Sequence, residues 1–221
     1  MGMPVLVIGE SGSGKTSSLR NFDRKDVLII SVSGKRMPFR KKMNVVNVRS
    51  ASYTERYEII NECFTKYSSK VKTFVIDDSQ YLMSFEEMDR VYEKGYDKFT
   101  ELAKHFIDLI ELIKELPDDV IVYLLHHSSK NDDGETKAKT IGKMIDDHIT
   151  LEGLFEIVLM TKHDDSGYHF LTRGGIKDTV KTPIDMFDKE IIDNDLKMVN
   201  EKIREYYEIS LDKGETVNEK N

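Results

Sequence analysis

Residues 5–16 read Val-Leu-Val-Ile-Gly-Glu-Ser-Gly-Ser-Gly-Lys-Thr, an apolar run that passes directly into a glycine-rich loop. The last eight of these residues match Gly-x-x-x-x-Gly-Lys-Thr, the pattern of a phosphate-binding loop (Walker A motif). Glycine lets the backbone turn tightly and aim its N–H groups at phosphates, and the N-terminus of a following helix adds partial positive charge. The stretch therefore predicts a strand, a phosphate-binding loop and then a helix that begins near Lys15.

Each position of this loop has an expected role in binding a nucleoside triphosphate, which we take to be ATP. Lys15 is expected to reach the β- and γ-phosphates and to take part in catalysis, and the Thr16 hydroxyl is expected to ligate Mg²⁺. The full pattern in a strand–loop–helix context makes a chance match remote. The rest of the expected nucleotide-binding set is Gly9, Glu10, Ser11, Gly12, Ser13, Gly14 and Ser17.

Four further short runs rich in Val, Ile and Leu predict strands. They are nearly continuous rather than alternating, which is typical of strands buried on both faces of a parallel sheet. A capping box at Ser52 and Glu55 opens one helix between them, and an apolar stripe over residues 97–116 predicts another. Strands that alternate with helices indicate an α/β fold with a mainly parallel sheet flanked by helices. The four runs are 27–32, 73–76, 120–125 and 157–160.

The pattern changes after residue 160. Residues 157–162 and 168–172 read as two strands of a β-hairpin with Gly167 in the turn. A last amphipathic helix is expected over about residues 196–207. The sequence thus predicts one domain, residues 1–213, followed by a polar tail, residues 214–221.

Two adjacent carboxylates, Asp77 and Asp78, close the buried strand that begins at Thr73. Burying both without a nearby cation would be costly, which favours a metal-binding role over a strand that simply ends in solvated acids. Asp77 is the expected partner of Mg²⁺, directly or through water. Asp78 is then placed to polarise the attacking water, and we assign it as catalytic together with Lys15.

His126 and His127 lie at the end of the next predicted strand. Successive strand residues point to opposite faces, so only one of the two can face a nucleotide. Either could sense the γ-phosphate, and a plain strand-end histidine is the alternative. Adjacent strand residues cannot chelate one ion, so no metal site is expected there.

Basic residues cluster in two segments. The run 35–42 carries five of them together with Phe39 and contains no acid. The second set is Arg173, Lys177 and Lys181. Either set could contact nucleic acid, and Arg173 and Lys177 could instead reach a neighbour's nucleotide in an oligomer, although charge runs are commonly just solvated faces.

Composition narrows the class of protein. A net charge of −7 does not by itself indicate a nucleic-acid binder, but phosphate contacts depend on a local patch rather than on the sum. No apolar run is long enough for a membrane span, and the first residues do not read as a secretory signal. The single cysteine, Cys63, excludes an intramolecular disulfide framework and suits a reducing cytoplasm.

The ordered set of motifs resembles the phage-encoded AAA-type ATPases with a minimal RecA-like core, some of which are proposed single-strand annealing or recombination proteins. The resemblance runs from about residue 3 to residue 187, and its specific part is 141–160 together with 181–187. It implies ATP binding, a RecA-like sheet, self-association into a homo-oligomer and action on single-stranded DNA, in the cytoplasm of a bacterial host. The motifs are GESGSGKT (9–16), VIDDSQYL (75–82), LLHHSSKND (124–132), TIGKMIDDHITLEGLFEIVLMT (140–161) and KTPIDMF (181–187).

One departure from RecA-type recombinases leaves alternatives open. Those proteins carry a catalytic Glu after the strand that follows the phosphate-loop helix, whereas here that strand runs into Ser-Val-Ser-Gly-Lys, residues 31–35. The catalytic role therefore moves to Asp78, and a non-hydrolysing nucleotide-binding regulatory subunit is one alternative to an Mg²⁺-dependent ATPase. A small-molecule kinase of the nucleotide-kinase kind is another, although the 131–139 loop lacks the arginines of a kinase lid.

Overall fold

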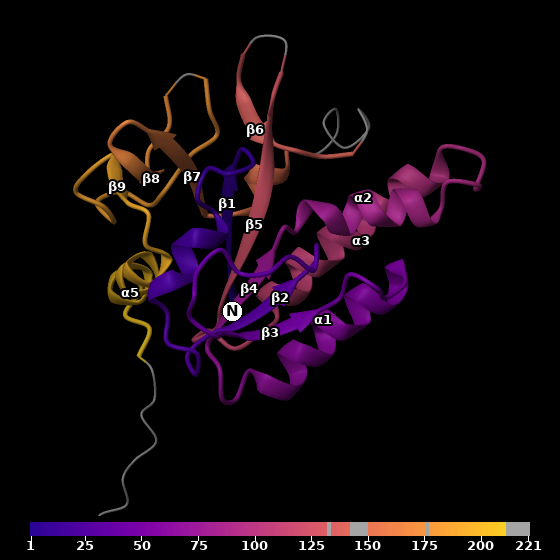
Figure 1. The fold of residues 1–221 in the computed structure, drawn as a ribbon, viewed down its shortest axis with the longest axis horizontal. Helices are drawn as coiled ribbons and strands as arrows, with labels where there is room; N and C mark the ends of the chain where they lie inside the picture. The colour runs from indigo at the N-terminus through magenta and orange to yellow at the C-terminus, as the bar shows by residue number, and fades with distance from the viewer. Residues whose placement is uncertain (132–133, 142–149, 176, 211–221) are drawn as a thin grey trace, which may run out of the picture.

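A computed structural model describes residues 1–131, 134–141, 150–175 and 177–210 (Figure 1). The strands are β1 (Met3–Gly9), β2 (Leu28–Ser31), β3 (Asn44–Asn47), β4 (Thr73–Asp77), β5 (Ile121–Lys130), β6 (Thr136–Ala138), β7 (Ile157–Asp164), β8 (Gly167–Leu171) and β9 (Ile191–Asp193). The helices are α1 (Tyr53–Tyr67), α2 (Gln80–Asp89), α3 (Asp97–Lys114) and α5 (Leu196–Tyr206), with two short 3-10 helices, η1 (Thr16–Asn21) and η2 (Leu151–Leu154).

The described strands form one mixed, mostly parallel sheet in the order β3-β2-β4-β5-β1-β7-β8-β9, with β6 paired to the far end of β5. The strands from β3 to β7 in this order run parallel, and β8, β9 and β6 are antiparallel to their neighbours. The register sets Gly9 opposite His127 and Asp77 opposite Leu125. The ends of β1, β4 and β5 therefore meet at one edge of the sheet, as the sequence predicts for a RecA-like α/β fold.

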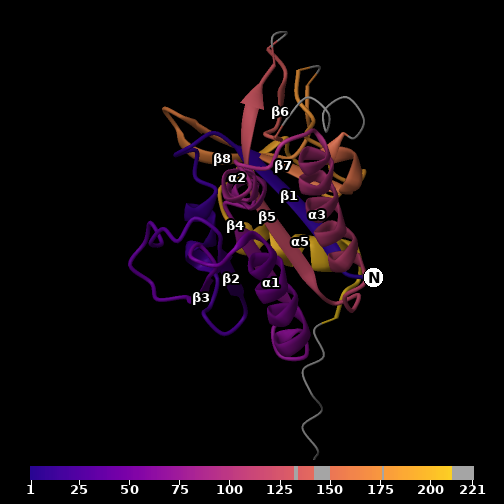
Figure 2. The same cartoon turned by 90° about the vertical axis from the view of Figure 1, so that its right-hand side faces the viewer.

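Each face of the sheet carries its own apolar core. Leu6 and Ile8 of β1 point into a core covered by α1, α2 and α3, whereas Val5 and Val7 point into a core with residues of η1 and α5. Figure 2 shows α1, α2 and α3 in front of the sheet and α5 behind it. Burial on both faces explains why the central strands read as continuous apolar runs.

Several local predictions are confirmed. Ser52 and Glu55 form a full capping box at the start of α1, and α3 spans most of the predicted 97–116 stripe. The hairpin is present as β7 and β8, with Gly167 at φ 120° in its turn. The last helix, α5, ends one residue before the predicted boundary. The helix expected near Lys15 is the 3-10 helix η1, which starts at Thr16.

Other elements were not anticipated, namely α2 and the three short strands β3, β6 and β9. Part of the 131–139 loop, residues 132–133, lies outside the described residues, as do 142–149 of the motif at 140–161 and the tail 214–221. Among the residues that the structure describes, no helix combines the length and the apolar character needed to cross a membrane.

Candidate functional site

The glycine-rich loop lies at the edge of the sheet, between the end of β1 and η1. Gly12 and Gly14 adopt φ values of 78° and 101°, which L-residues with a side chain rarely adopt. Gly9 serves a different purpose, because a Cβ there would collide with the hydroxyls of Thr161 and Ser13. These hydroxyls lie 2.5 Å apart, so β7 supports the loop from the side.

Lys15 is enclosed by the loop that carries it. Its side chain is buried, and its ammonium donates to the carbonyl oxygens of Gly9 at 2.7 Å and Glu10 at 2.8 Å. Burial lowers the pKa of Lys15 to about 8, although the Asp78 and Asp77 carboxylates oppose the shift. An ammonium has three donors, and two are used to close the loop. The third donor is available for a phosphate.

Thr16 and Asp77 form the second part of the site. The Thr16 hydroxyl donates to Asp77 Oδ1 at 2.9 Å, and Asp77 is 2% exposed. Burial and the neighbouring Asp78 carboxylate raise the pKa of Asp77 to about 6. The ionised form of a carboxylate that is held out of water in this way is stabilised by a nearby positive charge. A divalent cation would supply that charge.

The residues present fit Mg²⁺. Magnesium prefers oxygen ligands and commonly takes one or two from the protein, completing its octahedron with water and substrate phosphates. Thr16 and Asp77 provide such a pair. No cluster of three or more His, Cys, Asp or Glu side chains among the described residues could hold a metal ion by itself.

Asp78 occupies a different environment from its neighbour. Its backbone is left-handed, with φ 61°, and this turns its side chain towards Lys35 and His127. Lys35 Nζ lies 3.1 Å from one carboxylate oxygen and His127 Nε2 lies 3.1 Å from the other. Burial works against it, but hydrogen bonds from His127 and Lys35 hold the pKa of Asp78 well below its usual range. Asp78 is therefore ionised, and each of its two oxygens keeps a second lone pair that can accept a hydrogen bond from a water.

The two histidines separate as the alternation of a strand requires. His126 is fully buried, with Nε2 donating to the Lys139 carbonyl at 2.9 Å and Nδ1 lying 2.9 Å from Ser79 Oγ. Burial lowers the pKa of His126 to about 4, so its ring is neutral at physiological pH. It connects β5 to the 139 segment and does not line the cavity beside the loop. His127 does line that cavity, so of the two possible sensors the structure places only His127 there.

These groups converge on a cavity of about 190 Å³ between the loop and the ends of β4 and β5. Sequence reasoning missed three residues of its wall, Lys35, Arg36 and Pro38, which lie in the segment that it described as a basic run. The only feature of the sequence that could have pointed to these residues is that the segment after the second strand contains no acid. The lining includes Gly14, Lys15, Thr16, Ser17, Lys35, Arg36, Asp77, Asp78 and His127.

A second, larger cavity of about 430 Å³ lies on the other side of the loop, between β5, β6 and β7. It is lined by Glu10 and Ser13 of the loop and by Lys130 and Lys162 of the strands. Lys130 Nζ is 3.6 Å from a Glu10 carboxylate oxygen, so the β5–β6 hairpin contacts the phosphate-binding loop directly.

The remaining predicted residues lie away from this chain's own loop. Arg173 donates to the Phe187 carbonyl at 2.6 Å, and the Lys177 carbonyl accepts from the Thr136 N–H at 2.9 Å. Neither lines either cavity beside the loop. Within the basic run 35–42, Phe39 is partly buried against the core and Lys41 pairs with Asp23 at 3.3 Å.

Comparison with known proteins identifies the family. The family model described as AAA domain matches residues 1–183, most of the chain. No curated protein matches the chain.

Proposed function

Because this chain belongs to the AAA domain family, a family of nucleotide-binding P-loop ATPases, we propose that it is an Mg²⁺-dependent ATPase whose active site is the 190 Å³ cavity. The observation that carries this proposal is the 2.9 Å contact between Thr16 and Asp77 beside the buried ammonium of Lys15. It brings a phosphate-binding cation and a pair of metal-binding oxygens together from two strands that are far apart in the sequence.

Each residue then has a definite task. Lys15 and the loop N–H groups bind and orient the β- and γ-phosphates. Thr16 and Asp77 supply oxygen ligands for the metal ion. Bound Mg²⁺ neutralises the charge that develops on the phosphates. The ionised carboxylate of Asp78 is hydrogen-bonded to His127 at the end where the terminal phosphate is expected, and Asp78 orients the attacking water.

We further propose that the protein acts on single-stranded DNA in recombination, annealing or replication, as a homo-oligomer. The support is the resemblance of its motifs to phage-type annealing ATPases, together with the contact between the β5–β6 hairpin and the phosphate-binding loop. The hairpin extends beyond the edge of the sheet (Figure 1), and the side chains of Lys130 and Lys137 on it are 64% and 48% exposed. A strand held on this hairpin would lie next to Glu10 of the loop.

One specific observation favours a second candidate, a nucleotide-binding regulatory subunit that does not hydrolyse ATP. Lys35 and His127 each contact one oxygen of Asp78, and the connection after β2, residues 31–35, contains no acid, whereas RecA-type recombinases carry a Glu after the corresponding strand. If these partners keep water away from the remaining lone pairs of Asp78, the site binds ATP without activating water.

The experiment that tests the proposed function is ATP turnover with and without Mg²⁺ and with and without a single-stranded oligonucleotide. We expect Mg²⁺-dependent turnover that the oligonucleotide stimulates. Lys15→Ala serves as the inactive reference, because loss of a charge-assisted phosphate contact costs about 1.5–3 kcal/mol of binding. Tight ATP binding without turnover in all conditions supports the regulatory candidate, and turnover by Lys15→Ala equal to that of the parent contradicts the assigned site.

A further inference from the structure

The connection after β2 carries Lys35 into the nucleotide cavity. Gly34 makes the turn with φ 71°, and its N–H donates to Ser31 Oγ at 3.2 Å. A side chain at position 34 would press against Asn47 and Arg49 at about 3.1 Å, so the turn packs closely beside β3. The backbone of Lys35 is thus held in position, whereas its side chain is 62% exposed and has room to move.

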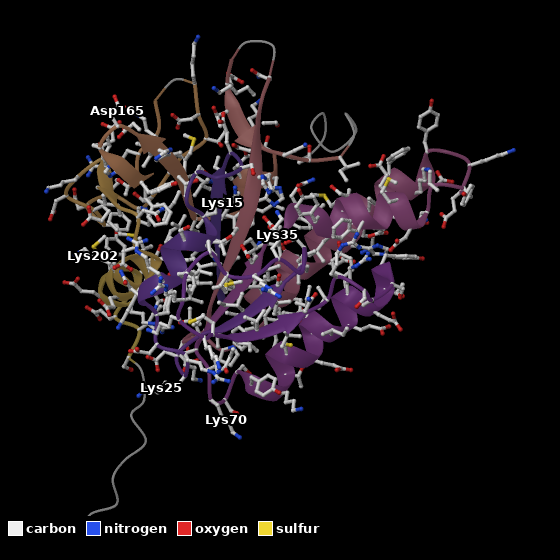
Figure 3. The ribbon with its side chains drawn as sticks, in the orientation of Figure 1. Lys15, Lys25, Lys35, Lys70, Asp165 and Lys202 are labelled. Atoms are coloured by element: carbon white, nitrogen blue, oxygen red, sulfur yellow. The ribbon has the colours of Figure 1, made fainter. Side chains whose placement is uncertain are left out.

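Lys35 and Lys15 enter the cavity from different sides. The strand order places β4 and β5 between β2 and β1, so the two lysines approach the Asp77–Asp78 pair from different strands (Figure 3). Lys15 uses two donors on loop carbonyls. Lys35 Nζ lies 3.1 Å from Asp78 Oδ2 and 5.5 Å from the centre of the Tyr81 ring. Partial burial opposes it, but the Asp78 carboxylate raises the pKa of Lys35, so its ammonium is charged.

The arrangement indicates where each phosphate of a nucleotide would find its cation. The loop N–H groups and Lys15 surround the position of the β-phosphate, which ATP and ADP share. The terminal phosphate of ATP extends from the loop towards the metal-binding acid, which here lies at the end of β4. At that end the cavity wall carries Lys35, on a side chain long enough to exchange one anionic partner for another.

We propose that Lys35 contacts the terminal phosphate of bound ATP from the side opposite Lys15, and that this contact makes the site distinguish ATP from ADP with a cation of the same chain. This inference rests on the proposed function of the cavity. In making the contact, Lys35 leaves Oδ2 of Asp78, and this frees one more acceptor site on that oxygen for a hydrogen bond from water. The lysine thereby links occupancy of the terminal-phosphate position to the number of acceptor sites that Asp78 offers to water.

If Lys35 only held Asp78 in place, removing its charge would change the affinities for ATP and ADP equally. The test is therefore the ratio of affinities for fluorescently labelled ATP and ADP, measured by titration in the presence of Mg²⁺. We expect Lys35→Ala to weaken ATP binding by about tenfold or more while ADP binding changes by less than about twofold, the range of a charge-assisted hydrogen bond. Lys35→Arg, which keeps the charge, should restore most of the preference for ATP.

Lys41→Ala is the matched control, because Lys41 lies on the same connection but pairs with Asp23 at the surface and does not line the cavity. It should leave the affinities for ATP and ADP unchanged. Thermal unfolding of each variant checks that the fold is retained. Equal losses for ATP and ADP in Lys35→Ala, or no loss for either, overturn the inference while leaving the proposed ATPase site standing. A parent protein that binds neither nucleotide contradicts the proposed function, and the inference falls with it.

Discussion

Asp77 and Asp78 are adjacent in the chain and yet face different chemistry. Asp77 is buried against the Thr16 hydroxyl, whereas Asp78, turned by its positive φ, pairs with Lys35 and His127. We expect Asp77→Asn to weaken Mg²⁺-dependent ATP binding and Asp78→Asn to spare binding but slow turnover. Titration with Mg²⁺ and ATP, followed by steady-state turnover, measures both. If the two variants lose binding to the same extent, the division of roles is wrong.

The raised pKa of Asp77 has a consequence for pH dependence. Mg²⁺ binds the ionised carboxylate, and below about pH 6 the folded protein holds that carboxyl protonated. Metal affinity should therefore rise as the pH rises through about 6, and should fall by roughly tenfold per unit below it. A phosphate group of the nucleotide also titrates near pH 6, so the contribution of Asp77 to the pH dependence must be separated from that of the phosphate.

The variant Asp77→Asn separates the two contributions to the pH dependence, because it lacks the titrating carboxyl and keeps the shape of the side chain. Mg²⁺-dependent ATP binding is compared between the parent and Asp77→Asn at pH 5, 6, 7 and 8. The difference between the two proteins should shrink towards acid pH. A difference that is constant with pH would show that Asp77 does not titrate in this range.

At the scale of elements, β7 shapes the loop that follows β1. Thr161 of β7 contacts Ser13 of the loop at 2.5 Å and the Ile8 carbonyl at 3.3 Å. Thr161→Val removes these hydrogen bonds with little change in volume, so it should cost about 1–2 kcal/mol of stability and also weaken nucleotide binding. The measurements are denaturant unfolding and ATP titration.

Thr172→Val provides the matched control for this substitution. Thr172 is likewise buried, its hydroxyl donates to the Lys189 carbonyl at 2.8 Å, and it lines neither of the two cavities beside the loop. Both variants should lose similar stability, and only Thr161→Val should lose ATP affinity. Equal ATP affinity in the two variants would mean that β7 does not set the shape of the loop.

The central elements could be predicted from sequence because their signals are local. Continuous apolar runs marked the buried strands, and the pair Ser52 and Glu55 marked the start of α1. The strand β3, Asn-Val-Val-Asn, gave no such signal because it lies at the edge of the sheet with alternate residues exposed. The position of Lys35 in the site could not be predicted, because it depends on β2 lying next to β4, and strand order is set by packing across the whole sheet.

At the scale of the whole molecule, the proposed DNA binding must overcome a net charge of −7. Sequence reasoning relied in part on Phe39 for base stacking, and that ring is partly buried against the core. An electrostatic contribution comes from exposed Arg40 and Lys42 of the basic run and from Lys130 and Lys137 of the β5–β6 hairpin. A protein that grips phosphates in this way binds weakly as one subunit and more tightly as several subunits on one strand.

We therefore expect weak binding to single-stranded DNA that ATP strengthens and that rises together with self-association. With three or four phosphate contacts per subunit, affinity should fall by about tenfold to a hundredfold between 50 and 200 mM salt. Fluorescence anisotropy of a labelled oligonucleotide, with sedimentation in parallel, measures both quantities with and without ATP and Mg²⁺. Lys130→Ala with Lys137→Ala tests the hairpin, and Arg40→Ala with Lys42→Ala tests the basic run. Of the four residues substituted, Lys130 is the one with an ion pair to the phosphate-binding loop, through Glu10, so the hairpin variant should also reduce the stimulation of turnover by DNA and the basic-run variant should not. A protein that binds ATP but no oligonucleotide at 50 mM salt under any nucleotide condition would refute the recombination proposal and favour the regulatory one.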